Sequence, residues 1–260
     1  MINQVQKKIL ILALFAGEIM LKSGAEIYRV EDTVTRICKA CNIPYAEVFA
    51  TTTGIFVSVD EGSEHSDMHT FLKRIRNSSI DLEKISKINQ FSRTFASTDL
   101  SIDEGMDLLK EINHSSQFAF LWRVLGAGMI ASFFTVMLGG LFLDFIASFA
   151  IGVLTYFVTI FLERLELNLF IKDFCSCALV AFLALLFVGI GLGHSTHLII
   201  IGSIMIFLPG VSITNAVRDS LTGDLVSGLS RAMEAILVAV AIAAGVGLVL
   251  KIFGAFGGVY

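Results

Sequence analysis

Residues 174–217 read FCSCALVAFLALLFVGIGLGHSTHLIIIGSIMIFLPGVSITNAV, a stretch of 44 residues without a single charged side chain. A helix needs about 20 mainly apolar residues to cross the hydrocarbon core of a bilayer. The stretch is therefore too long for one span and long enough for two, and the polar turn at 191–197 divides it. These residues predict a membrane protein with two neighbouring transmembrane helices in this region.

Further uncharged segments lie on both sides of this stretch. Residues 124–143, 145–162 and 235–250 carry no charge, and each is long enough for about one span. Gly139-Gly140 allows a tight turn between the first two, so they are expected to form a hairpin. Five transmembrane helices are therefore expected, near residues 122–140, 142–162, 174–192, 197–215 and 229–251.

Most charged residues precede these segments. Residues 1–117 hold 13 Lys or Arg and 16 Asp or Glu, whereas residues 118–260 hold only 6 and 7. The first part therefore has the charge of a water-soluble domain, and a domain boundary is expected near Gln117. The formal net charge is −4, and the sequence has no basic tract, which argues against a nucleic-acid-binding protein.

The head at residues 1–117 is expected to be a small α+β domain. Residues 26–42 have apolar side chains at three-to-four-residue spacing, which predicts one buried helix face. The segment 47–59 is rich in Val, Phe, Ile and Thr and predicts a strand or a hairpin broken at Gly54. The other expected elements are a helix at 3–22, a strand at 69–77 that pairs with the hairpin, a helix capped by Asp81, and a helix at 102–113 opened by a capping box from Ser101 to Glu104.

The loop charges predict the orientation, because cytoplasmic loops are enriched in Lys and Arg. With the head in the cytoplasm, the positive charges of the first segment and of the second and fourth loops fall inside. The C-terminus at Tyr260 then faces outward. The residues concerned are Arg123, Arg164, Lys172, Arg218 and Arg231, and only Lys251 lies on the outer side.

The densest group of charged residues near the membrane lies between 209 and 234. Pro209 is expected to break its helix, and Gly210 permits close backbone approach, so the two could form a hinge. Broken helices with charged groups nearby form substrate sites in many transporters. The arginine fork suits a carboxylate, and an Asp or Glu could carry a coupling proton.

These considerations give a candidate transport site. Its substrate-binding residues are Arg218, Arg231 and Asn215, and its coupling residues are Asp219, Asp224, Asp144 and Glu234. Other readings stay open at this point. Arg218 and Arg231 could be topological anchors, Arg231 and Glu234 could form an ordinary i,i+3 pair, and Asp144 could simply cap the second membrane helix.

The head also holds residue types found in enzymes and metal sites. Cys38 and Cys41 are three residues apart on an amphipathic helix, and Glu64, His65 and Asp67 form a short polar run. A catalytic triad is assembled from separated segments, so adjacent residues are poor candidates for one. We expect buried or half-buried thiols and a solvated loop, with no enzyme activity, metal or cofactor.

Two segments resemble the threonine/serine exporter family. The first reads Gly24-Ala-Glu26-x-Tyr28-Arg29-Val30-Glu31-Asp32-Thr33-Val34-x-Arg36-Ile37. The second reads Pro209-Gly210-x4-Asn215-x2-Arg218-Asp219-x4-Asp224-x3-Gly228-x2-Arg231, and Gly139-Gly140-x3-Asp144 also matches. The resemblance covers nearly the whole chain.

The resemblance implies export driven by the proton motive force across a bacterial cytoplasmic membrane. Full-length members fuse this unit to a second, smaller membrane unit, and the chain is similar to the split members in which a separate small integral membrane protein supplies it. The substrate would then be threonine, serine or a small dicarboxylate such as succinate, and an oligomer is expected. The alternative is a membrane-anchored ligand sensor or a regulatory subunit of another transporter.

Overall fold

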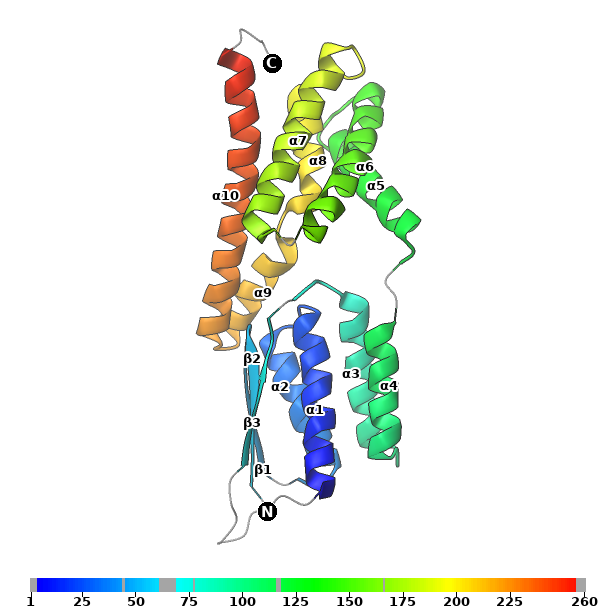
Figure 1. Cartoon of the computed structure of the whole chain (residues 1–260), viewed down its shortest axis with the longest axis vertical. Coiled ribbons are helices and arrows are strands. Elements are labelled where there is room, and N and C mark those ends of the chain that lie inside the picture. Colours follow the sequence, from blue (N-terminus) through cyan, green and yellow to red (C-terminus); the bar gives the residue numbers. More distant parts are fainter. Residues whose placement is uncertain are drawn as a thin grey trace. The chain divides into compact units, whose positions relative to one another are not determined.

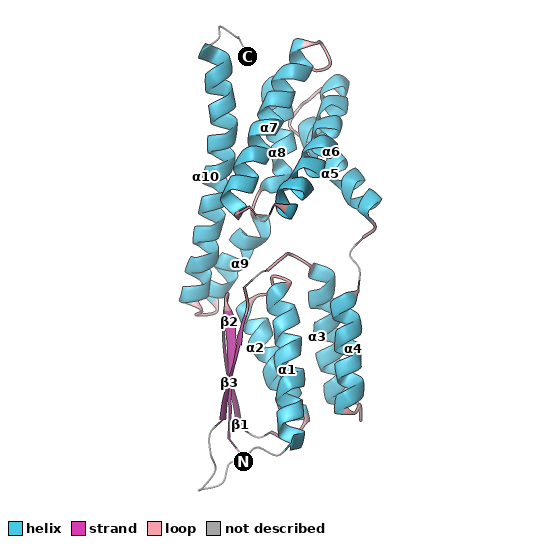
Figure 2. Cartoon of the chain, in the orientation of Figure 1, coloured by secondary structure: helices cyan, strands magenta, loops and turns pink. Residues whose placement is uncertain are grey.

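The computed structural model describes residues 4–43, 45–60, 69–76, 78–115, 118–165 and 167–255. The chain is mostly helical, with one small sheet in its N-terminal part (Figure 2). It divides into two compact units, described separately below. The first comprises Met1–Ser115 and Val211–Ala232, and the second comprises Ser116–Gly210 and Met233–Tyr260. The segment 211–232, which the sequence analysis assigned to the membrane domain, thus belongs with the head.

The head consists of four helices and a three-stranded sheet within its described residues (Figure 1). The sheet is antiparallel with strand order β1-β2-β3. The elements are α1 (Gln4–Lys22), α2 (Ile27–Ala40), β1 (Tyr45–Thr51), β2 (Gly54–Asp60), β3 (His69–Arg74), α3 (Leu82–Ser97) and α4 (Ile102–His114).

The core of the head lies between the sheet and the helices. Helices α1 and α2 pack against one face of the sheet, and α3 and α4 pack against α1 on the other side (Figure 1). Gly17 of α1 allows this packing, because a Cβ there would lie 2.7 Å from a methyl group of Val34 and 3.0 Å from one of Ile55. The opposite face of the sheet is exposed at Phe49 and Leu72.

The expected local features of the head are present. The apolar face of α2 is fully buried, and β1 and β2 form a hairpin that turns just before Gly54. The Asp81 side chain accepts a hydrogen bond from the Lys84 N–H (3.0 Å), which caps α3. Ser101 and Glu104 form the expected capping box at α4. The polar run at Glu64–Asp67 lies outside the described residues.

The second unit and the segment 211–232 contain the apolar helices. Four described helices are long and apolar enough to cross a membrane, namely α5 (Phe120–Met137), α6 (Phe142–Arg164), α7 (Leu169–Gly189) and α10 (Leu225–Ala255). A fifth span results if α8 (Thr196–Ile204), the 3₁₀ turn η1 (Met205–Phe207) and α9 (Gly210–Leu221) are taken as one broken helix. The membrane class therefore agrees with the composition, and the four or up to five spans include the number expected.

The expected fourth helix at 197–215 is not continuous. It ends at Ile204, tightens into η1, and resumes at Gly210 after Pro209. Proline lacks an N–H and clashes with the preceding turn, which explains the interruption. The fifth helix begins earlier than expected, at Leu225, so that residues 225–228 are helical as well.

Small residues allow α5, α6 and α8 to pack closely in the second unit. A Cβ at Gly152 of α6 would lie 2.8 Å from the Ala127 carbonyl oxygen of α5, and one at Gly202 of α8 would lie 2.0 Å from Thr135 Oγ1. Thr135 also donates a hydrogen bond to Ser148 Oγ (2.7 Å). Close approach of small residues combined with buried hydroxyl bonds is typical of helix association in membranes.

Candidate functional site

The turn between α1 and α2 presents backbone groups that neither helix uses. Gly24 follows the end of α1 with a φ of +81°, a conformation that favours glycine. The carbonyl groups of Gly24 and Ala25 remain free for contacts outside the two helices. The N–H of Ile27, the first residue of α2, has no partner within its own helix. Turn 24–27 therefore needs polar partners from elsewhere in the unit.

The hairpin of α9 and the start of α10 supplies these partners. Its helices are joined at Gly223, which has a φ of +100°. They cross closely at Gly228, where a Cβ would lie 2.2 Å from Ser220 Oγ and 2.9 Å from the Ala216 carbonyl oxygen. Only a residue without a side chain fits this crossing, so glycine fixes how the polar groups of the two helices are placed.

Four side chains of this hairpin bind turn 24–27. Asn215 Nδ2 donates to the Gly24 carbonyl (2.9 Å), and a terminal guanidinium N–H of Arg231 donates to the Ala25 carbonyl (2.6 Å). The Ile27 N–H donates to Asp219 Oδ1 (3.1 Å). Arg218 forms an ion pair with the Glu26 carboxylate. We call this set of contacts the clasp: Asn215, Arg218, Asp219 and Arg231 with residues 24–27.

Asp219 and Arg231 form the buried centre of the clasp. The Asp219 side chain is 0% exposed and that of Arg231 is 10% exposed, and Arg231 Nε lies 2.9 Å from Asp219 Oδ2. The N–H is not directed along this line, so the pair is an ion pair without a hydrogen bond between these two atoms. Removing one partner of a buried ion pair leaves an uncompensated charge, which costs about 3–5 kcal/mol. The two residues therefore depend on each other.

Glu26 and Arg218 form the outer part of the clasp. The Glu26 carboxylate is nearly buried, whereas the Arg218 side chain is 51% exposed. Arg29 also pairs with Glu26, at 3.1 Å from its Nε. Glu26 is thus a carboxylate held between two guanidinium groups, one of which is open to solvent. An arginine fork in this position can exchange one carboxylate for another.

The structure brings together four of the residues selected from sequence and leaves three apart. Asn215, Arg218, Asp219 and Arg231 meet at the clasp. Asp224 is half-buried at the turn between α9 and α10. Glu234 is exposed on α10, and within the described residues Arg231 pairs with Asp219 instead of Glu234.

Asp144 lies in the second unit and binds backbone N–H groups. Its Oδ2 accepts from Leu141 (2.9 Å), and its Oδ1 accepts from His194 (2.6 Å) and Ser195 (3.1 Å). These bonds cap the N-terminus of α6 and tie it to the residues that precede α8. These contacts agree with the hypothesis that Asp144 caps the second membrane helix. A coupling role was the other hypothesis for this residue.

Glu26 and Arg29 were absent from the candidate site chosen from sequence. Both belong to the segment that carries the family resemblance, and that was the available signal. The two resembling segments, which start at Gly24 and Pro209, are far apart in the chain but meet at the clasp. The two segments that carry the family resemblance are therefore in contact with each other in the structure.

Comparison with known proteins agrees with this pattern. The sequence profile of the threonine/serine exporter family matches residues 11–253. A protein described as a probable threonine/serine exporter of Mycobacterium tuberculosis is 23% identical over 94% of this chain and 46% of its own length. The threonine/serine exporter of Corynebacterium glutamicum is 23% identical over 93% of this chain and 50% of its own length.

The chain therefore spans about half the length of these curated relatives. No solved structure matches it. The family profile covers most of the chain and includes both segments that meet at the clasp. The chain belongs to the threonine/serine exporter family.

Proposed function

We propose that this chain is the larger membrane unit of a secondary exporter that moves threonine, serine or a small dicarboxylate such as succinate out of the cytoplasm. Membership of the family and the apolar helices support an exporter in a membrane. The loop charges support a cytoplasmic head and an outward C-terminus in a bacterial cytoplasmic membrane. The observation that carries the proposal is the clasp, because it gathers arginine and carboxylate groups beside a broken helix.

Arg218 binds the substrate carboxylate in this proposal. Its guanidinium is half-exposed and already holds the carboxylate of Glu26. A substrate carboxylate that replaces Glu26 would form the same charge-assisted hydrogen bonds. Loss of the ion pair between Glu26 and Arg218 would loosen turn 24–27. Asn215 and Arg231 would then become available to the substrate. Substrate binding to Arg218 and opening of the clasp then occur together.

Asp219 is the preferred coupling residue. It is a fully buried carboxylate whose charge is balanced by Arg231. Protonation of Asp219 would remove that balance and weaken the hold on the Ile27 N–H, which would open the clasp. Proton entry could thus drive the transport step. Asp224, Asp144 and Glu234 are further coupling candidates, and Asp144 is the weakest of these since backbone N–H groups surround its carboxylate.

The interruption at Pro209 and Gly210 is proposed as the hinge. A Cβ at Gly210 would meet nothing within 4 Å, so the glycine is not required for packing. Gly210 is the first residue of α9, and the wide conformational range of glycine would allow bending there. Discontinuous helices beside a binding site are a recurring feature of secondary transporters.

A second membrane unit is part of the proposal. The chain spans about half the length of its curated relatives, and the proposed partner is a small integral membrane protein in an oligomeric exporter. The deciding experiment measures efflux of preloaded threonine, serine and succinate from cells that express the chain with and without that partner. Efflux of one substrate that requires both proteins and collapses with the proton gradient is expected.

The opposite result would separate the two candidate functions. Undiminished efflux from liposomes that contain the purified chain alone would refute the two-part exporter. Absence of efflux for all three substrates with both proteins present would refute export and favour the sensor or regulatory subunit.

A further inference from the structure

Asp173 is a buried carboxylate in the second unit. It is the fifth residue of α7 and is 5% exposed. Helix α10 lies against α7 beside it (Figure 1), since a Cβ at Gly245 would lie 2.4 Å from the carbonyl oxygen of Phe174. Within the described residues the Asp173 carboxylate has neither a hydrogen bond nor an ion pair, and the neighbouring Lys172 is paired with Glu163 of α6 (2.9 Å). A carboxylate in a membrane segment that lacks a partner is costly and therefore points to a function.

The elements that pack against α7 bring no counterion to Asp173 within the part of the chain that the structure describes. Residues 235–250 of α10 carry no charged side chain, and the titratable residue of α8, His197, lies in its first turn. At its C-terminal end α6 adds Arg164, whose side chain is exposed. On α7 itself the buried Cys177 thiol shares the face of Asp173. The negative charge of Asp173 is therefore left for a mobile ion to neutralise.

A line of hydroxyl groups leads from Asp173 into the helix bundle. Ser176 lies about one turn further along the same face of α7, and its Oγ is hydrogen-bonded to Thr159 Oγ1 of α6 (3.0 Å). Thr155 lies one turn from Thr159 on α6. The hydroxyl groups of Thr155 and of Ser203 on α8 are buried and have no hydrogen-bond partner among the described residues. We call these five residues the polar seam: Asp173, Ser176, Thr159, Thr155 and Ser203.

The two unpaired hydroxyl groups lie at nearly the same depth in the bundle. Thr135 Oγ1 is 2.7 Å from Ser148 Oγ of α6 and 3.5 Å from the Leu198 carbonyl oxygen of α8, which places these two residues level with each other. Both helices are joined to α7 by short turns, so they run in the same direction. Thr155 follows Ser148 by seven residues and Ser203 follows Leu198 by five, so their depths differ by about 3 Å.

The layout of the polar seam suits a proton better than a metal ion. Its oxygens follow one another along the helices at steps of about one turn, roughly 5 Å, and do not surround a single point. A metal cation needs several oxygens around it at once, whereas a hydroxyl group can accept a proton from one neighbour and donate its own to the next. Buried hydroxyl groups without partners are also the groups to which an internal water binds.

We propose that Asp173 binds and releases a coupling proton in the second unit and that the polar seam is the route of this proton into the bundle. The carboxylic acid gives its proton to water and becomes a carboxylate, and it returns to the neutral form by taking a proton from hydronium. As a coupling step this rests on the proposed proton-driven export. In the proposed orientation Asp173 lies toward the cytoplasmic end of α7, where a proton that enters from outside would be released.

Proton binding is tested without transport, by infrared spectroscopy of the purified full chain in detergent as the pH is raised. The difference spectrum should contain the carbonyl band of a protonated carboxyl group, and Asp173→Asn should remove it. Glu163→Gln is the matched control, because Glu163 is exposed and ion-paired, and it should leave the band in place. Asp173→Glu keeps a carboxyl group and should retain a band at a shifted frequency. A spectrum that Asp173→Asn leaves unchanged would overturn proton binding at this residue.

Coupling is tested in liposomes that contain the chain and its proposed partner. Asp173→Asn mimics the protonated acid, so it should retain the exchange of internal for external substrate but lose net efflux driven by a proton gradient. Thr155→Val removes an unpaired hydroxyl group of the polar seam and should slow net efflux. Ser132→Ala is its control, since the Ser132 hydroxyl donates within its own helix to the Gly128 carbonyl (2.9 Å), and it should change neither rate.

The possible results separate this inference from the proposed function. Equal loss of exchange and net efflux in Asp173→Asn would overturn the coupling role, and so would undiminished net efflux. Equal effects of Thr155→Val and Ser132→Ala would overturn the polar seam as the route. Failure of the exporter itself would appear as absent efflux from the unaltered pair of proteins, and the infrared band of Asp173 would still decide whether this residue binds a proton.

Discussion

Arg231 Nε lies 2.9 Å from Asp219 Oδ2 in a buried position, and each residue also binds the turn between α1 and α2. A residue of α9 and a residue of α10 therefore share both an ion pair and a common target in the head. Asp219 and Arg231 each bind turn 24–27 and are also paired with each other. The contacts of the clasp should therefore be lost together when it opens. The predictions below follow from this arrangement and from the rest of the head.

Loss of the Asp219 charge should weaken the clasp and with it the protection of the Ile27 N–H. In Asp219→Asn the Arg231 charge loses its counterion, and the clasp should be destabilised by about 3–5 kcal/mol. Hydrogen exchange of the peptide that contains Ile27 should accelerate, as measured by mass spectrometry. The double variant Asp219→Asn with Arg231→Gln removes both charges and should recover part of the loss. Additive effects of the two single substitutions would contradict the coupling.

Arg218→Lys should preserve the charge but impair transport. A lysine cannot reproduce the bidentate fork for a carboxylate, so efflux should fall about tenfold or more at a normal membrane level. Arg218→Ala should behave similarly. Glu26→Gln should act in the opposite sense, lowering the substrate concentration needed for half-maximal efflux, because the built-in competitor is removed. Normal efflux by a fully expressed Arg218→Lys protein would remove this residue from the binding site.

Gly228→Ala should separate α9 from α10. The added methyl group would lie 2.2 Å from Ser220 Oγ and 2.9 Å from a backbone oxygen, so the helices must move apart. We expect faster hydrogen exchange in the peptide that contains Ile27 and reduced efflux. Gly247→Ala is the matched control on the same helix, because a Cβ there meets nothing within 4 Å. Equal effects of the two substitutions would show that the close crossing is unimportant.

The stability of the head should depend on the charge of Glu18. Burial alone would raise the pKa of Glu18, but Lys22 and Lys73 outweigh it and lower the pKa below its usual value. The stabilisation is therefore full above the ordinary pKa of about 4.3 and is lost as the pH falls through the lowered value. Because both lysines are about half-exposed, Glu18→Gln should cost about 1 kcal/mol at pH 7 and progressively less as the pH falls through the lowered pKa of Glu18.

Cys38 offers a reporter for that measurement. Its thiol is fully buried, and burial together with the nearby Cys41 raises its pKa to about 12, so it should react only when the head opens. Modification by dithiodipyridine, resolved for Cys38 by peptide mass spectrometry, should be faster in Glu18→Gln than in the unaltered protein at pH 7. The ratio of the two rates should fall toward one as the pH is lowered through the pKa of Glu18. A ratio that does not change with pH would exclude an electrostatic role for Glu18.

The orientation can be tested with a reporter enzyme that is active only outside the cytoplasm. Fused after Tyr260 it should be active, and fused after His114 it should be inactive, because the head is expected on the cytoplasmic side. Activity of the His114 fusion with an inactive Tyr260 fusion would reverse the topology and with it the direction of the proposed transport.

Much of the architecture could be predicted from the sequence because its causes are local. The span-length apolar segments indicated the membrane helices, and Pro209 indicated the interruption at the start of α9. The capping box at Ser101 and the apolar face of α2 likewise depend on residues within a few positions of each other. The helix bounds differed by a few residues, since a helix end in an apolar run has no strong side-chain signal.

The candidate site was predictable only in part. The sequence grouped Asn215, Arg218, Asp219 and Arg231 into one candidate site, and these residues do meet. Their partners could not be read from it. Arg231 and Asn215 bind carbonyl groups of Ala25 and Gly24, and every residue has a carbonyl, so no side-chain pattern marks that contact.

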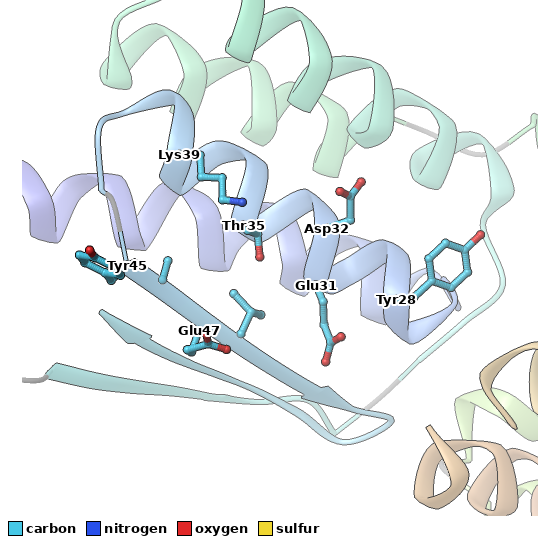
Figure 3. Close-up of a pocket in the computed structure, with 9 residues that line it drawn as sticks. Tyr28, Glu31, Asp32, Thr35, Lys39, Tyr45 and Glu47 are labelled. Atoms are coloured by element: carbon cyan, nitrogen blue, oxygen red, sulfur yellow. The ribbon is translucent and has the colours of Figure 1, made fainter. Parts of the chain in front are cut away.

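The sequence by itself therefore determined the membrane class, the α+β head and the family. Only the tertiary structure decided that the segment 211–232 packs with the head and that Asp219 meets both Arg231 and Ile27. It also decided that α2 and β1 leave a cavity between them (Figure 3). The physical reason is that apolar periodicity and capping act over a few residues. Contacts between positions 192 residues apart, as for Ile27 and Asp219, depend on how the packed helices finally bring backbone groups together.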